Sequence, residues 1–378
     1  MSRIVSFVDS NSPVYVPWWR TDVTPDEAQL VMQAIAAEHI SMGPVTADFE
    51  RELGALIDVP YVVATTSGSV ALTLAMMALG IGPGDEVIVP DRTFIATAHA
   101  AHMLGARIVL ADCLPGYPNV DPQDIARKIT TRTKAIMVVH LNGRCCEMDE
   151  IVAIADRHGI PVVEDAAQAI FSQSPAGYMG GLGRIGCFSL GMTKLASTGQ
   201  GGAVVTRDPE LYQQLRAMRN HGVRDVVSHD YLQSGNNFKF TDLQAALGLG
   251  QIRRAQEKVA HCNRVYDAYV RGLAGQYRVT PLEVSTGSGE CALWTEVVCE
   301  RRDALANYLG TQGIQTRKFL PCLHSAPHLS ANTHFPNSIS FGARGLVLPS
   351  GPAQPMENVE RTIAIIRNWL GVNTAQRA

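Results

Sequence analysis

Short apolar segments of strand length alternate with segments of helical periodicity through the first half of the chain. The apolar segments predict strands at residues 61–64, 86–89, 107–110, 135–139 and 161–163. Between them, apolar residues recur with helical spacing at residues 70–79, 96–104, 122–129 and 148–158. Because parallel strands need a crossover connection, usually a helix, this alternation predicts a doubly wound α/β domain with a parallel sheet covered on both faces.

The pattern changes after residue 206. Helical periodicity at 209–220 and 241–273 is followed by a strand-like segment at 294–299, helices near 303–312 and 359–370, and a stretch rich in proline and histidine at 321–336. We therefore predict a large α/β domain at residues 1–255 and a smaller α+β domain at residues 256–378.

Composition indicates a globular chain of about two domains. The 378 residues are 46% hydrophobic and 18% charged, which is enough apolar content for a large core. The net charge is −3, from 32 Lys and Arg against 35 Asp and Glu. This balance lacks the basic excess that nucleic acid or an anionic membrane favours.

No stretch of the sequence predicts export or a membrane span. Residues 1–9 lack the long apolar core of a signal peptide. Residues 59–84 carry no charge and are long enough to cross a bilayer, but Pro60 and the turns at 67–69 and 82–84 divide them into strand, turn and helix lengths. Eight cysteines without a CxxC pair indicate reduced thiols, so we expect a cytoplasmic protein.

Lys194 is the single formal charge between Arg184 and Arg207, among apolar and small residues. Burial in such surroundings disfavours the ammonium form and lowers the pKa of a lysine, which prepares it as a nucleophile or for a Schiff base. The alternative is a lysine on a glycine-rich surface turn. This stretch alone leaves both interpretations open.

Two further stretches place chemistry where ligands bind parallel sheets, beyond the carboxyl ends of the strands. Hydroxyls and free N–H groups at residues 65–70 suit a phosphate at a helix N-terminus, or an ordinary helix cap. Asp165 ends a predicted strand and could hold a protonated ring nitrogen, with Gln168 in reach, or could cap a helix. Taken with Ser189 and Lys194, these groups fit pyridoxal phosphate.

Several sequence blocks, in order and spacing, resemble the DegT/DnrJ/EryC1/StrS family of pyridoxal phosphate-dependent sugar aminotransferases. The blocks lie at residues 67–72, 82–90, 93–97, 164–169, 188–194 and 237–246, and the resemblance extends from residue 43 to residue 349. It implies the aspartate aminotransferase fold (fold type I), with a mainly parallel seven-stranded sheet in the large, cofactor-binding domain.

The resemblance also implies a role for each matching residue at the cofactor ring. Lys194 is expected to form the Schiff base and to move the proton between carbon atoms. Asp165 is expected to pair with the pyridine nitrogen, Gln168 to approach the ring hydroxyl, and Phe94 to stack on the ring.

The phosphate has its own set of matching residues. Ser69, Val70 and Ser189 are expected to hold it within one subunit. Asn237 matches a residue that the family lends from the neighbouring subunit, which implies a homodimer with sites at the interface.

Four positions depart from the family pattern. Ser69 stands where threonine is frequent, Gln200 replaces a glutamate, Lys239 replaces an arginine and Asn142 replaces a tyrosine. Ser69 keeps the hydroxyl, and we expect the other three to influence substrate preference. Some relatives with histidine in place of the Schiff-base lysine are dehydratases, and Lys194 argues against that activity.

The resemblance implies a ping-pong aminotransferase that converts a keto sugar, nucleotide-linked, to an amino sugar with glutamate as donor, in polysaccharide or antibiotic biosynthesis. An aminocyclitol transaminase is the runner-up, and a sugar dehydratase or a non-catalytic regulator on the same fold are further alternatives. Gly181, Gly183 and Gly186 match the dinucleotide fingerprint G-x-G-x-x-G but precede a strand-like segment, which disfavours an NAD-dependent oxidoreductase.

Histidines and cysteines are not spaced as metal ligands. Pro327 prevents a regular helix between His324 and His328, and His99 and His102 fall within an apolar helical pattern. His140 with Cys145 and Cys146 shows no recognisable ligand spacing. We predict no metal.

Overall fold

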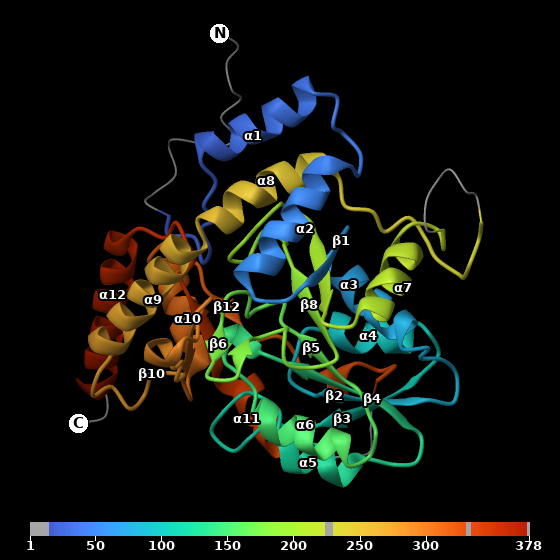
Figure 1. The fold of residues 1–378 in the computed structure, drawn as a ribbon. Helices are drawn as coiled ribbons and strands as arrows, with labels where there is room; N and C mark the ends of the chain where they lie inside the picture. The colour runs from blue at the N-terminus through green and yellow to red at the C-terminus, as the bar shows by residue number, and fades with distance from the viewer. Residues whose placement is uncertain (1–14, 224–229, 330–333, 376–378) are drawn as a thin grey trace.

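A seven-stranded sheet organises the larger part of the molecule (Figure 1). The computed structural model describes residues 15–223, 230–329 and 334–375. The strands are β1 (Tyr61–Thr65), β2 (Glu86–Pro90), β3 (Arg107–Ala111), β4 (Thr133–Val139), β5 (Val162–Asp165), β8 (Ile185–Ser189) and β9 (Gly202–Thr206). Their order is β1-β9-β8-β5-β4-β2-β3, and β9 alone runs antiparallel to its neighbours. The predicted mainly parallel seven-stranded sheet is therefore confirmed.

Helices cover both faces of this sheet. One face carries α3 (Gly68–Ala78), α4 (Ala96–His102) and α7 (Pro209–Arg219), and the other carries α2 (Pro44–Leu56), α5 (Pro122–Lys128), α6 (Met148–Asp156) and α8 (Asp242–Arg253). The alternation of side chains along a strand produces the two layers. In β2, Val87 and Val89 pack with the first set of helices, whereas Ile88 between them packs with α5 and α6.

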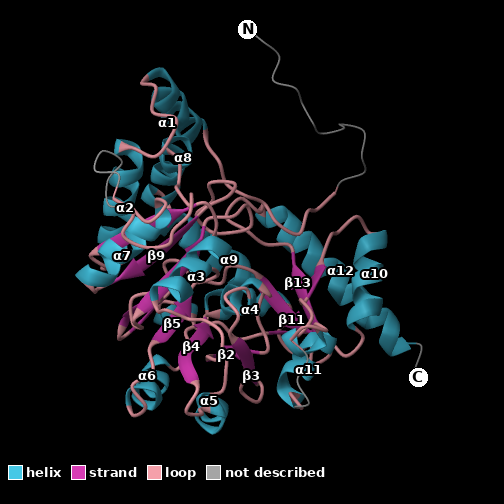
Figure 2. Cartoon of the chain, turned by 90° about the vertical axis from the view of Figure 1, so that its right-hand side faces the viewer, coloured by secondary structure: helices cyan, strands magenta, loops and turns pink. Residues whose placement is uncertain are grey.

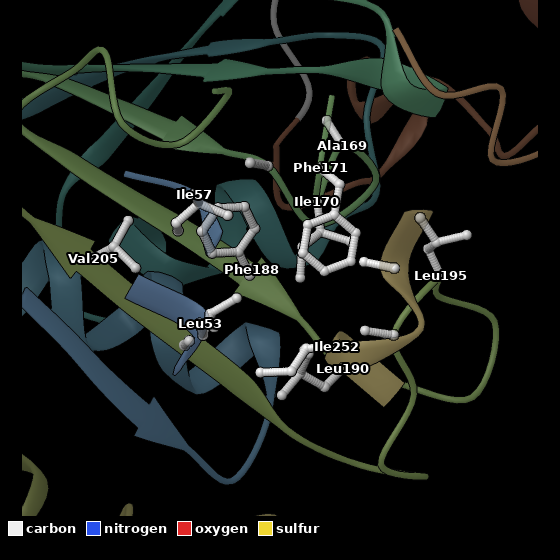
Figure 3. Packing of buried hydrophobic residues seen from close by; sticks show 14 of the residues in the cluster. Leu53, Ile57, Ala169, Ile170, Phe171, Phe188, Leu190, Leu195, Val205 and Ile252 are labelled. Carbon is white, nitrogen blue, oxygen red and sulfur yellow. The ribbon is translucent and has the colours of Figure 1, made fainter. Parts of the chain in front are cut away.

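Phe188 on β8 lies at the centre of the cluster that holds α2 and α8 against the sheet (Figure 3). Its ring packs with Leu53, Ile57 and Val205. Gly180 passes so close that a Cβ there would lie 2.5 Å from the Phe188 ring, and its φ is +92°. This packing fixes the strand whose last residue is Ser189.

A second, four-stranded antiparallel sheet forms the smaller α+β unit (Figure 2). Its strands are β10 (Thr280–Pro281), β11 (Thr295–Val298), β12 (Arg317–Lys318) and β13 (Gly345–Leu348), with helices α9 (Ala255–Gly272), α10 (Arg302–Thr311), α11 (Pro336–Arg344) and α12 (Met356–Ala375). The predicted boundary after residue 255 falls in the first turn of α9 and stays a prediction. The lead-in to α1 (Pro25–Ala36) reaches this unit, since Val16 and Trp19 form bridges with Ile314 and Ser350.

The remaining elements are short. A hairpin joins β6 (Gln173–Ser174) to β7 (Gly177–Tyr178), and three 3-10 turns lie at Leu141–Gly143, Thr286–Ser288 and Leu323–Ser325. Within the described ranges, no helix combines the length and the apolar character that crossing a bilayer requires. Residues 1–9, on which the expected lack of a signal peptide rests, lie outside these ranges.

The helical pattern predicted at residues 241–273 is two helices rather than one. The chain leaves helical geometry at Arg254, where φ is −99° and ψ is 15°. The Arg254 guanidinium forms ion pairs with Asp22 at 2.5 Å and Glu257 at 3.1 Å. Periodicity alone does not reveal this break, because apolar residues keep helical spacing on both sides of it.

Candidate functional site

A cavity of about 360 Å³ lies between the carboxyl ends of the large sheet and the edge of the small one. Six of the eight predicted cofactor residues line it: Ser69, Phe94, Asp165, Gln168, Ser189 and Lys194. The small unit supplies further lining residues, Trp294, Glu296 and the segment 317–320. The cavity is thus built from both units.

Lys194 follows β8 in a turn where its N–H donates to the Gly191 carbonyl at 3.0 Å. Burial lowers the pKa of Lys194 to about 8, although the charge of Asp165 opposes the change. The Nζ atom lies 5.5 Å from the centre of the Trp294 ring. The side chain is half-buried at the cavity, and with this pKa a larger share of it is neutral at pH 7–8 than of an exposed lysine.

Asp165 ends β5 and is 4% exposed. Burial raises the pKa of its carboxyl group, and two hydrogen bonds oppose that change. The Thr97 hydroxyl donates to Oδ2 at 2.8 Å, and the Ala167 N–H donates to Oδ1 at 3.1 Å. A carboxylate held in this way can stabilise a proton on a ligand nitrogen.

The N-terminus of α3 meets the end of β8 at close range. Ser69 and Ser189 both line the cavity there, and a Cβ at Gly68 would lie 2.7 Å from the Ser189 Cβ. Glycine at position 68 therefore lets the two hydroxyl-bearing segments approach each other. Val70 does not line the cavity, and its N–H donates to the Ser67 hydroxyl at 3.2 Å as an ordinary helix cap. Its predicted phosphate contact stays a prediction.

Asn142, one of the departures, is fully buried and joins the two units. Its φ is +53°, in the left-handed region that asparagine tolerates. Its side chain donates to the Trp294 carbonyl at 2.7 Å and accepts from the Trp294 N–H at 2.5 Å. Its N–H donates to Gln168 Oε1 at 2.8 Å. Asn142 therefore positions two lining residues.

Asn237 and two further departures, Lys239 and Gln200, lie at or beyond the edge of the cavity. Asn237 is exposed and does not line it. Lys239 donates to Asn220 Oδ1 at 3.3 Å. Gln200 lines the cavity, and its carbonyl accepts from the Gln244 side chain at 2.7 Å.

Several residues that line the cavity or bond to a lining residue were not identified from the sequence. Thr97 stands in the block at 93–97 as a polar residue in an apolar helix, which is a usable signal. Trp18, Arg92, Trp294 and Arg317 also line the cavity. Of these, Trp18, Trp294 and Arg317 lie far from the recognised blocks, so long-range folding alone brings them in.

The backbone of the glycine-rich segment that matches the dinucleotide fingerprint binds a side chain of the protein itself. The N–H groups of Gly180, Leu182 and Gly183 all donate to the Glu164 carboxylate, at 2.5–2.8 Å. His140 Nε2 lies 2.9 Å from the same carboxylate. These donors hold the buried Glu164 side chain next to Asp165, so their N–H groups are not available to bind a dinucleotide phosphate.

The histidines set aside as metal ligands form local contacts. His324 Nδ1 lies 2.7 Å from Asp91 Oδ2, and Cys322, within the same cluster, donates to the Ser338 carbonyl at 3.2 Å. His99 Nε2 lies 2.9 Å from His328 Nε2. The expectation of no metal stays a prediction.

The residues present fit pyridoxal phosphate. A lysine that loses its proton readily, a buried carboxyl group held by two hydrogen bonds and hydroxyls at a helix N-terminus match its aldehyde, ring nitrogen and phosphate. Fold and cavity together therefore define the pyridoxal phosphate-dependent aminotransferase class. The chain belongs to the DegT/DnrJ/EryC1/StrS aminotransferase family, whose sequence model matches residues 21–367.

Characterised relatives align over most of the chain. GDP-perosamine synthase of Caulobacter vibrioides is 34% identical over 351 residues, 90% of this chain and 94% of that protein. A dTDP-3-amino-3,4,6-trideoxy-alpha-D-glucose transaminase of Streptomyces venezuelae is 36% identical over 335 residues, 87% and 88% of the two chains.

Solved structures of aminotransferases superpose on most of the chain. DesV of S. venezuelae superposes with a TM-score of 0.89 at 32% identity, covering 94% of this chain and 98% of that one. A 3-amino-5-hydroxybenzoic acid synthase superposes with a TM-score of 0.87 at 26% identity, covering 95% and 99%.

Proposed function

We propose that this protein transfers the amino group of glutamate to a keto sugar, nucleotide-linked, as a step in making a polysaccharide or an antibiotic. The observation that carries the proposal is Lys194, with its pKa lowered to about 8, in one cavity with the buried Asp165. Relatives named for GDP- and dTDP-linked amino sugars support the substrate class. The 3-amino-5-hydroxybenzoic acid synthase keeps an aminocyclitol transaminase as the second candidate.

Pyridoxal phosphate, when bound, supplies an electron sink for the bond broken at the donor carbon. Lys194 would move the proton from that donor carbon to the cofactor's former aldehyde carbon, on the other side of the nitrogen, for which a pKa near working pH is suitable. Asp165 keeps the ring nitrogen protonated, supported by Thr97. Phe94 and Gln168 both line the cavity and are proposed to orient the ring.

The proposed assembly is a homodimer in which Asn237 of one subunit completes the phosphate site of the other. Asn237 is exposed and outside its own cavity lining, which such a role requires. Two large apolar side chains near the site, Phe94 and Met192, are 50% and 64% exposed, as expected of surfaces that a partner covers. A cytoplasmic location is supported by eight free cysteine thiols.

A substrate panel tests the proposal. The purified protein is incubated with glutamate and keto sugars linked to GDP, dTDP or UDP, and with keto cyclitols, and products are identified by mass. We expect an amino product from at least one keto sugar nucleotide and none from a Lys194→Ala variant. Amination of cyclitols alone favours the second candidate, and loss of water without nitrogen gain favours a dehydratase.

A further inference from the structure

Arg92 is a buried cation whose guanidinium has no hydrogen-bond partner within the described residues. It is 7% exposed and lines the cavity that holds Lys194. Among the described residues no acceptor binds its guanidinium, and its Nε atom is buried and unsatisfied. The guanidinium instead lies 4.3 Å from the centre of the Phe319 ring and 5.7 Å from that of Phe341.

The carboxylate whose charge acts most strongly on Arg92 is already paired with another arginine. Glu296 faces Arg92 and lines the same cavity, but its Oε2 accepts from Arg144 at 2.6 Å. Arg144 is itself fully buried and donates to the Glu283 carbonyl at 2.7 Å. This carboxylate is therefore already paired with Arg144, and within the described residues Arg92 has no ion pair of its own.

The thiols beside Arg92 do not supply the missing charge. Burial raises the pKa of Cys113 to about 12 and that of Cys322 to about 11. Both are neutral at pH 7. The Phe319 and Phe341 rings lie against its guanidinium, and no hydrogen-bond acceptor among the described residues is paired with it.

A buried, unpaired cation is costly for a folded protein, and an anion that enters from the cavity removes that cost. A planar guanidinium suits a carboxylate, which it can bind through two hydrogen bonds. Resting on the proposed function, we propose that Arg92 is a specificity-determining residue that binds a carboxylate of the substrate while Lys194 acts at the reacting atoms.

Two substrates could bring this carboxylate into the cavity. One is the side-chain carboxylate of the glutamate donor, and the other is a carboxylate on a uronic-acid sugar acceptor. Both sources offer the same group, a carboxylate. Pairs of ligands that differ in one carboxylate distinguish them. Glutarate and its monoamide probe the donor, and UDP-glucuronate and UDP-glucose probe the acceptor.

The experiment measures equilibrium binding of these four ligands to holoenzyme by calorimetry, for wild type, Arg92→Met, Arg92→Lys and the surface control Arg207→Met. We expect wild type to prefer the carboxylate in at least one pair. We expect Arg92→Met to weaken that ligand by roughly 10- to 100-fold, the range for hydrogen bonds to charged groups. The ligand that lacks the extra carboxylate in each pair should bind Arg92→Met as it binds wild type, and the Arg207→Met variant should bind all four ligands unchanged.

The melting temperature of the Arg92→Met variant distinguishes substrate recognition by Arg92 from a structural role. If Arg92 binds substrate, the ligand-free Arg92→Met protein melts no lower than wild type, because the variant removes an unsatisfied buried charge. A lower melting temperature with unchanged ligand binding identifies a packing role on Phe319 and overturns the proposal. Equal weakening of UDP-glucose and UDP-glucuronate identifies phosphate as the ligand and overturns it too.

If Arg92→Met does not fold, the wild-type pairs and Arg92→Lys decide. Wild type that shows no preference for the carboxylate in either pair overturns the proposal. Because binding needs no turnover, these results are independent of whether the protein transaminates. Failure of the proposed function would instead appear in the product panel, with carboxylate binding intact.

Discussion

Two lysines of this protein share an unusual pKa but not an environment that permits chemistry. Burial lowers the pKa of both Lys194 and Lys258 to about 8. Lys258 is 1% exposed and donates to the Gln251 side chain. Lys194 lines an open cavity opposite Asp165. A lowered pKa therefore marks burial, and the cavity distinguishes the lysine that can react.

The pH dependence of labelling tests this distinction. In the cofactor-free protein, Lys194 should react with an amine reagent at a rate that rises through about pH 8. The sign follows from the lowered pKa: below pH 8 the unreactive ammonium form dominates, and above it the neutral amine does. Exposed lysines should still be gaining reactivity near pH 10.

Mass spectrometry of labelled peptides supplies the measurement, and Lys258 is the matched control. Its pKa is equally low, but its burial should protect it at every pH at which the protein stays folded. A labelling midpoint for Lys194 near pH 10 contradicts the desolvated site.

A Thr97→Val variant tests whether the Thr97 hydrogen bond helps to keep Asp165 ionised. Its hydroxyl bond at 2.8 Å lowers the pKa of the Asp165 carboxyl against the effect of burial. Thr97→Val should therefore raise that pKa, so that the acidic limb of the kcat profile moves to higher pH. We expect kcat at neutral pH to fall roughly 10-fold, as for loss of one hydrogen bond to a charged group.

Thr311→Val is the matched control, because its hydroxyl bonds a backbone carbonyl on an exposed helix. Both variants should fold. An unshifted acidic limb in Thr97→Val means that Asp165 does not depend on this bond.

At the scale of elements, one side chain joins the helices α2 and α8. Asp242, the first residue of α8, is fully buried and accepts hydrogen bonds from the start of α2. The N–H groups of Gly43 and Thr46 bond its Oδ1 at 2.8 Å, and the Thr46 hydroxyl does so at 2.7 Å. The carboxylate therefore caps a helix about 200 residues away in sequence.

Loss of this cap should cost more than loss of an ordinary one. Asp242→Ala leaves several buried donors unsatisfied, so we expect the free energy of unfolding to fall by about 2–3 kcal/mol. Asp208→Ala, at the half-buried cap of α7, removes acceptors from only two N–H groups and should cost less. Denaturant unfolding of the cofactor-free protein measures both, and equal losses contradict the proposed role of Asp242.

Local elements could be predicted from the sequence because their causes are local. The strand at 107–110 and the helix at 122–129 differ from β3 and α5 by one residue at most. At the break, Arg254 pairs with Asp22, more than 200 residues away, and the pairing of Asn142 with Trp294 crosses between units. Such contacts are decided by tertiary packing, which periodicity does not encode.

The same contrast holds for the site. The sequence could place Lys194, Asp165 and Ser189 together because Asp165 and Ser189 end neighbouring parallel strands and Lys194 follows the second of them. The charge balance of Arg92, Arg144 and Glu296 could not, because it requires β11 to lie against the segment after β2.

At the scale of the whole molecule, the site is proposed to need two chains. Mixing Lys194→Ala with Asn237→Asp subunits tests this, since the aspartate should repel the phosphate. In a mixed dimer one site carries both substitutions and the other carries neither. After random exchange half of the dimers are mixed, so about a quarter of the sites should be active.

The control mixes Lys194→Ala with Lys194→Arg, which leaves every site without its lysine and should restore nothing. Activity is measured as amino product from glutamate after subunit exchange. If the first mixture also stays inactive while Asn237→Asp alone is impaired, Asn237 acts within its own subunit.

The central claim is that Lys194 carries pyridoxal phosphate in an aminotransferase site. Borohydride reduction of the holoenzyme, followed by peptide mapping, tests it most directly, because reduction makes the link to the lysine permanent. We predict a pyridoxyl group on Lys194 and on no other lysine. A holoenzyme whose label lies on another residue, such as Lys258, or that takes no label at all, would contradict the account.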